Sequence, residues 1–209
     1  MADEPPDLPS SKTGAGKESH LAMSDSSTIH PAQWDAASLQ RQCDTTRTRR
    51  SGPGGQNRNK VETAIVLVHR PTGLKVEANE RRRQGENLQV ALFRLRIALA
   101  LAVRLPRDLT QGPSALWRGR CRQGRLQINP THNDFPALLA EALDVLQLHQ
   151  DNPAAAAQFL GCTTSQFVKF LKLEPRAFVA FNQRRATIGS PPLRSLEITP
   201  KRVDTTEAG

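Results

Sequence analysis

Aromatic residues and long hydrophobic runs are what this 209-residue chain has least of. It has no tyrosine, two tryptophans and seven phenylalanines, 4% aromatic residues in total. Its longest apolar run, residues 97–103, lies between two arginines and is far shorter than the roughly 20 residues that a membrane-spanning helix needs. The N-terminus lacks the basic start and apolar stretch of a signal peptide. We therefore expect a cytoplasmic protein with a modest aliphatic core and no membrane contact.

Metal ligands and catalytic signatures are also sparse. Cys43, Cys121 and Cys162 form no Cys-x-x-Cys pair, which argues against a zinc ribbon or a redox motif and for reduced thiols. The five histidines form no His-x-x-x-His pair, and the sequence contains no Gly-x-Ser-x-Gly elbow. Because such signatures mark metal-dependent and serine-dependent hydrolases, we expect no metal and no cofactor.

Positive charge, by contrast, is abundant and concentrated. The net charge is +9, and residues 47–129 hold 18 of the 29 Lys and Arg residues but only 5 of the 20 Asp and Glu residues. Sixteen of those 18 cations are arginines, whose planar guanidinium suits phosphate. The segment therefore predicts a polyanionic partner, with nucleic acid the best fit. The alternative is a basic surface that serves solubility alone.

The first 125 residues divide into a tail and an α+β domain. Residues 1–30 are rich in Ser, Pro, Asp and Gly, which predicts disorder, and Met23 is an alternative start of the chain. In residues 31–125, strand and helix periodicities predict a small mixed sheet packed by one long helix, with Arg94 and Arg96 outside the apolar stripe of that helix. The strands are expected at 43–49, 63–69 and 74–78, and the helix at 87–103.

A linker rich in Pro, Gly and Arg, which includes Trp117, leads to a small helical module at residues 130–188. Helices are predicted at 134–149, 154–160, 164–171 and 176–185, followed by a loose tail at 189–209. Residues 155–171 resemble a helix-turn-helix pair, whose outward face would carry Ser165, Gln166, Lys169 and Lys172. The alternative is a plain helical bundle packed by Phe159, Phe167, Phe170 and Leu171.

One loop combines glycines with cations. The stretch Ser51-Gly52-Pro53-Gly54-Gly55-Gln56 lies in an arginine-rich part of the sequence, and its adjacent glycines allow positive φ and a close approach of the backbone to a substrate. We therefore predict that the loop meets nucleic acid. The alternative for each nearby cation is a solvated surface position. The predicted RNA contacts are Arg49, Arg50, Arg58, Lys60, Arg82 and Arg83.

In order and spacing, residues 44–104 resemble the peptidyl-tRNA hydrolysis domain of the class I peptide chain release factor family. The resemblance covers the glycine-rich loop, the strand to His69, the turn Pro71-Thr72-Gly73 and the run Arg82-Arg83-Gln84-Gly85-Glu86-Asn87 before a helix. Two positions depart from it, since the family commonly has Val in place of Arg58 and Ser in place of Arg83.

The resemblance implies a peptidyl-tRNA ester hydrolase that acts with the ribosome, with residues 31–125 as its GGQ domain and basic linker. It implies that Gly54 and Gly55 set the loop shape. The backbone N–H of Gln56 would stabilise charge as the ester opens, while its side chain would fit water. A placed water and a preorganised donor can promote ester hydrolysis without a side-chain base. Gln56 is often methylated in the family, which implies a glutamine methyltransferase as a further partner.

Codon-reading release factors carry large recognition regions on both sides of this domain, whereas only about 46 residues precede it here. We therefore expect a monomeric, codon-independent factor of the ribosome-rescue type. Some rescue factors have a basic C-terminal tail, but residues 186–209 carry as many acidic as basic side chains. Two other functions stay open, namely a non-catalytic ribosome- or RNA-binding factor and a helix-turn-helix nucleic-acid-binding regulator.

Overall fold

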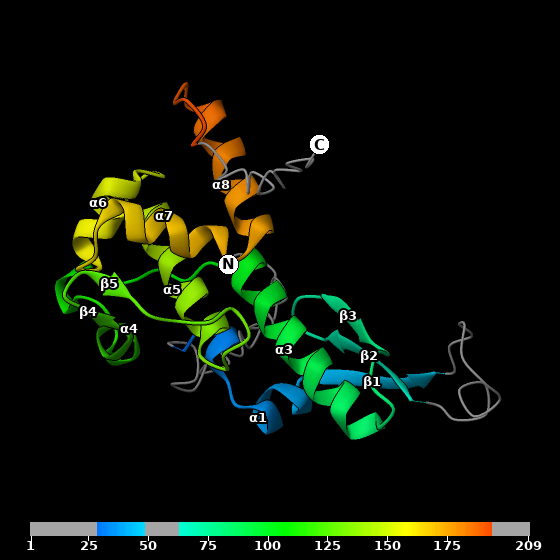
Figure 1. Cartoon of the computed structure of the whole chain (residues 1–209). Helices are drawn as coiled ribbons and strands as arrows, with labels where there is room; N and C mark the ends of the chain where they lie inside the picture. The colour runs from blue at the N-terminus through cyan, green and yellow to red at the C-terminus, as the bar shows by residue number, and fades with distance from the viewer. Residues whose placement is uncertain (1–28, 49–62, 194–209) are drawn as a thin grey trace, which may run out of the picture.

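The computed structural model describes residues 29–48 and 63–193. They form a small sheet, a long helix α3 (Gln84–Ala102) beside it, and a group of shorter helices (Figure 1). Figure 1 shows the sheet on one side of α3 and the shorter helices on the other. The predicted α+β class is confirmed. The predicted disordered segment up to residue 28 and most of the predicted tail lie outside the described residues.

The larger sheet has the strand order β1-β2-β3, and both neighbouring pairs are antiparallel. The prediction of a mixed sheet is therefore wrong. β2 and β3 are joined by a tight turn in which Gly73 takes a φ of 69°, and a parallel pair would need a crossover of about a dozen residues or more. The strands are β1 (Cys43–Thr48), β2 (Ala64–His69) and β3 (Lys75–Ala78).

Helix α3 begins at Gln84, earlier than the predicted start at Asn87, and is covered on two sides, by the sheet and by α5 (Phe135–Leu148). The cover on two sides explains why Arg96 is only 8% exposed, although it lies outside the apolar stripe that the sequence predicts. Its Nε donates to the carbonyl oxygen of Ala32 at 2.8 Å and its Nη1 to Oδ1 of Asn133 at 2.6 Å. A one-sided stripe does not describe a helix that is buried on two sides.

The segment predicted as a linker is folded. Trp117 is fully buried, its indole N–H donates to the carbonyl oxygen of Leu160 at 2.8 Å, and its ring packs edge-on against Phe170 with 5.6 Å between centroids. The segment is therefore anchored to the helical module. Its elements are the helix α4 (Ala115–Arg120) and the strands β4 (Cys121–Arg122) and β5 (Arg125–Leu126), which form a hairpin.

The helical module contains the four helices that the sequence predicts. Their buried side chains join those of α3 and the sheet in one hydrophobic cluster that runs from Ala32 to Phe181. The division between an α+β domain and a helical domain stays a prediction, but the two parts share one core. The helices after α5 are α6 (Pro153–Phe159), α7 (Thr164–Lys172) and α8 (Pro175–Thr187).

Candidate functional site

The end of β1 and the start of β2 lie at the same edge of the sheet, and the glycine-rich loop connects them. Thr48 pairs with Ala64 in the antiparallel register, so residues 49–62 leave and re-enter the sheet on adjacent strands. The structure thus fixes where the loop is attached and what surrounds its base. Seven predicted site residues lie in the loop, outside the described residues, namely Gly54, Gly55, Gln56, Arg49, Arg50, Arg58 and Lys60.

A buried asparagine ties the base of the loop to the segment before α3. Asn87 is fully buried. Its Nδ2 donates to the carbonyl oxygens of Thr63, at 2.7 Å, and Arg81, at 3.0 Å, while its Oδ1 accepts from the backbone N–H of Arg81 at 2.8 Å. One amide therefore fixes the residue before β2 against the start of an arginine run. The sequence patterns predict no site role for Asn87, although an amide at a helix start beside a cationic run is a recognisable signal.

Arg81, Arg82 and Arg83 form an exposed run at the same edge of the sheet. β3 ends at Ala78 opposite Ile65, so the run follows directly from the loop edge. Within residues 29–48 and 63–193, none of the three guanidinium groups forms a hydrogen bond or an ion pair. Their charges are therefore available to a ligand. Phosphate contact by Arg82 and Arg83 stays a prediction, and Arg81 is a residue that the sequence analysis missed.

The acidic neighbour of this run, Glu80, is held by Arg94 of α3. Arg94 donates one hydrogen bond to the Glu80 carboxylate and another, from Nη1, to the carbonyl oxygen of Glu77 at 2.6 Å. Desolvation, the largest single effect, disfavours the charged carboxylate. The hydrogen bond from Arg94, the backbone hydrogen bonds from Glu80 and Asn79 and the charge of Arg94 together outweigh it and lower the pKa of Glu80. Glu80 therefore stays charged and paired with Arg94, which leaves the positive charge of the arginine run in excess.

His69 lies at the opposite end of β2 from the loop. At about 3.3 Å per residue, the strand separates it from the loop edge by roughly 16 Å. The imidazole is buried, with Nδ1 2.8 Å from Oγ1 of Thr72 and its ring edge-on to Trp34. Burial, followed by the charge of Arg70, lowers the pKa of His69. A neutral imidazole packed in a turn serves the fold and not the chemistry of the loop.

Metal binding and membrane insertion find no support in the part of the chain that the structure describes. There, no group of three His, Cys, Asp or Glu side chains could hold a metal ion. In the same ranges, no helix is both long and apolar enough to cross a bilayer. The described part of the site is a run of arginines, unpaired within the described residues, at the sheet edge where the glycine-rich loop is attached.

The described residues thus combine an antiparallel sheet, one covering helix and an exposed arginine run at the sheet edge where residues 49–62 attach, a surface suited to a polyanion. Residues 37–115 match the family described as the RF-1 domain. Peptide chain release factor 1 of Streptococcus thermophilus is 54% identical over 50 residues, 24% of this chain and 14% of that protein. The chloroplastic peptide chain release factor PrfB1 of Arabidopsis thaliana is 50% identical over 56 residues, 27% of this chain and 12% of that protein.

Over residues 37–115 the chain is therefore similar to the RF-1 domain, the GGQ domain of class I release factors. The shared segments span only 14% and 12% of the two relatives. The matched residues end at 115, where α4 begins. The hairpin and helices α5 to α8 lie beyond them.

Proposed function

We propose that this protein is a ribosome-dependent hydrolase that cleaves the ester between a nascent peptide and its tRNA. The observation that carries the proposal is the sequence Gly54-Gly55-Gln56 in a loop attached to adjacent strands of an RF-1 domain. The unpaired arginine run beside the loop base supports it, because the substrate and its surroundings are RNA. The site of action is the peptidyl transferase centre of the large subunit, and the cellular site is the cytoplasm.

The reaction is an attack of water on the ester carbonyl. The water oxygen bonds to the carbonyl carbon, the bond from that carbon to the ribose oxygen breaks, and a proton from water ends on the ribose oxygen. In the proposal, Gly54 and Gly55 shape the loop, and the backbone N–H of Gln56 donates to the developing oxyanion. The Gln56 side chain places the water. One preorganised donor of this kind is worth about 3 kcal/mol of barrier.

The cations around the loop bind RNA phosphates and supply affinity for the ribosome. Asn87 joins the loop base to the arginine run and keeps the loop base in position. Gln56 is in addition a proposed substrate for a glutamine methyltransferase, and the protein acts as a monomer. The proposed phosphate contacts are Arg49, Arg50, Arg58, Lys60, Arg82 and Arg83.

We also propose that hydrolysis does not depend on a stop codon, as in ribosome rescue. In release factors, codon reading belongs to regions outside the GGQ domain. Here the chain after the RF-1 match continues into a helical module that shares its hydrophobic core with the RF-1 domain. We propose that this module recognises a ribosomal state instead of a codon, since the match to the release factor family ends at residue 115, before the module begins.

The test uses ribosomes that hold labelled peptidyl-tRNA in the P site and have an A site that is empty, contains a sense codon or contains a stop codon. We expect the full chain to release peptide equally from all three complexes, and Gly55→Ala to abolish release. Gly85→Ala is the matched control, because a Cβ at Gly85 meets no atom within 4 Å. Release only at stop codons would contradict codon independence. Ribosome binding without release would instead support the non-catalytic alternative.

A further inference from the structure

The β4–β5 hairpin places two arginines opposite each other without an acidic partner. Arg122 pairs with Arg125 across the hairpin, and like charges directly opposite each other on a sheet are destabilising. Both side chains are exposed, and within the described residues neither forms a hydrogen bond or an ion pair. Arg120 differs, because its Nη2 lies 2.6 Å from Oδ2 of Asp134. An anionic ligand would offset the repulsion between Arg122 and Arg125.

This hairpin lies against the start of α7. The carbonyl oxygen of Gly124, in the hairpin turn, accepts a hydrogen bond from the N–H of Thr163 at 3.3 Å. Thr163 in turn caps α7, since its Oγ1 accepts from the N–H of Gln166 at 3.2 Å. The contact joins the two guanidinium groups and the first turn of α7 into one surface.

Helices α6 and α7 occupy the segment whose sequence resembles a helix-turn-helix pair, and they contact each other. Gly161 in the connecting turn takes a φ of 68°, a left-handed conformation that favours glycine. Ala157 of α6 and Phe167 of α7 are buried between the helices and the rest of the core. The opposite face of α7 is exposed at Ser165 and Lys169, which lie one turn apart on the same side.

Arg122 and Arg125 of the hairpin and Ser165 and Lys169 of α7 form what we name the hairpin–α7 surface. Its charge is of one sign, because residues 113–128 and 152–173 contain six Lys and Arg residues and no Asp or Glu. Three carboxylates border these segments, and each is already paired. They are Asp134, bound by Arg120, Asp151, bound by Arg184 at 2.9 Å, and Glu174, bound by Arg176 at 2.7 Å.

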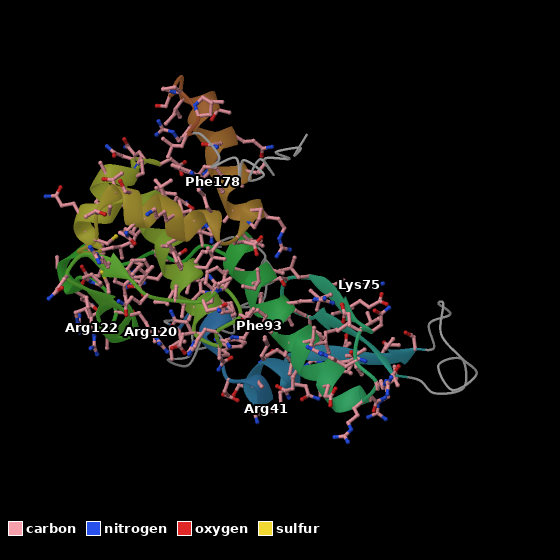
Figure 2. All side chains as sticks on the ribbon, viewed as in Figure 1. Arg41, Lys75, Phe93, Arg120, Arg122 and Phe178 are labelled. Atoms are coloured by element: carbon pink, nitrogen blue, oxygen red, sulfur yellow. The ribbon has the colours of Figure 1, made fainter. Side chains whose placement is uncertain are left out.

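The residue types of this surface suit phosphates better than base edges. Sequence reading in the major groove relies on Arg, Asn and Gln side chains on the recognition helix. The exposed side chains of α7 are Thr164, Ser165 and Lys169, and its one glutamine, Gln166, is half-buried. The arginines are on the hairpin, where their planar forks can bind phosphate oxygens. Figure 2 shows Arg122 at the outer edge of the molecule. A double helix that presents two phosphate rows fits such a surface.

We propose that the hairpin–α7 surface binds the phosphate backbone of double-helical RNA. The choice of RNA over DNA, and of a helix of ribosomal RNA, rests on the proposed function. The hairpin–α7 surface would then supply the second contact of the protein with the ribosome, apart from the arginine run at the loop.

The test measures binding of the full chain to an RNA duplex of about 20 base pairs and to DNA of the same sequence, between about 50 and 200 mM salt. The variant is Arg122→Gln with Arg125→Gln. The matched control is Arg41→Gln with Lys75→Gln, which removes two exposed cations in other parts of the molecule (Figure 2). We expect the Arg122/Arg125 variant to bind RNA at least about tenfold more weakly and to lower the salt slope by about 2. The control should change RNA affinity much less.

Thermal unfolding separates lost binding from lost structure, because removing the opposed charges should leave the melting temperature unchanged or raise it. Equal RNA affinity for the variant and the unchanged protein would overturn the proposal, as would sequence-selective binding to DNA in preference to RNA. The assay needs no hydrolysis, so we expect Gly55→Ala to retain duplex binding. A failure of the hydrolase proposal would therefore leave this result intact, and a failure here would leave peptide release intact.

Discussion

Asn87 Nδ2 lies 2.7 Å from the carbonyl oxygen of Thr63, the last described residue before β2. The same side chain bonds both backbone groups of Arg81. A fully buried amide thus couples three segments, namely the base of the glycine-rich loop, the arginine run and the first turn of α3. Because buried polar groups are costly to leave unpaired, these segments keep their relative positions.

Asn87→Ala should reduce both stability and peptide release. It leaves the partly buried carbonyl of Thr63 and both backbone groups of Arg81 without their partner, a loss of about 1 to 3 kcal/mol in the free energy of unfolding. Urea unfolding measures that loss, and the release rate at saturating protein measures the positioning of the loop. Gln89→Ala, at an exposed position of the same helix, is the control. An unchanged saturated rate in Asn87→Ala would show that the amide serves the fold alone.

Arg82→Gln combined with Arg83→Gln should raise the KM for ribosomes and leave the saturated release rate nearly unchanged. Phosphate contacts remote from the ester stabilise the ground state and the transition state equally. The KM should rise about tenfold at low salt, and the difference should shrink as salt increases. Steady-state release at several salt concentrations provides the measurement. A fall in kcat at constant KM would instead place these arginines in the alignment of the loop.

Trp117→Phe should destabilise the sheet side of the molecule as well as the helical module. The variant loses the indole hydrogen bond to Leu160, worth about 1 to 3 kcal/mol when the acceptor is left unpaired. It also leaves Trp34, packed against His69, as the sole tryptophan of the chain. Because the core is continuous, Trp34 fluorescence should show unfolding at a lower urea concentration than in the unchanged protein. If the urea midpoint does not change, the two parts unfold independently.

Asp144 should make the protein less stable as pH rises from about 4 to about 6. Burial is the main cause that raises the pKa of this carboxyl from 3.8 to about 6, against the hydrogen bond from Leu105 and the charges of Arg104 and Arg107, with Glu141 adding to the rise. The folded state therefore holds the proton more tightly than the unfolded chain does, and ionisation above pH 4 costs stability until the folded-state pKa is passed.

The measurement compares urea unfolding of Asp144→Asn with the unchanged protein across this pH range. Relative to the variant, the unchanged protein should lose on the order of 2 kcal/mol between pH 4 and 6 and then level off. Asp108→Asn is a control with the opposite pH dependence. Hydrogen bonds from Thr110 lower the pKa of Asp108, so the contribution of Asp108 to the free energy of unfolding is lost as the pH falls. If the difference in the free energy of unfolding between Asp144→Asn and the unchanged protein did not vary with pH, the raised pKa of Asp144 would be contradicted.

Helices and strands with a strong local pattern of apolar and turn residues can be predicted from the sequence. The β-branched run and the Pro71-Thr72-Gly73 turn predict the hairpin of β2 and β3, and three- and four-residue spacing predicts α3 and the module helices. The predictions failed where a segment packs through distant partners. Trp117 looked like part of a basic linker because its partners, Leu160 and Phe170, come more than forty residues later.

The sequence by itself determined the functional groups of the protein, namely the Gly54-Gly55-Gln56 motif and the surplus of arginine, and the positions of its helical segments. These are properties of residue type and local spacing. Only the tertiary structure decided that Asn87 holds Thr63, that Arg96 is buried against Ala32, and that Arg122 faces Arg125 beside α7. Periodicity reports which side of an element is apolar, but the partner of a buried polar group or an unpaired charge is set by chain segments brought together only on folding.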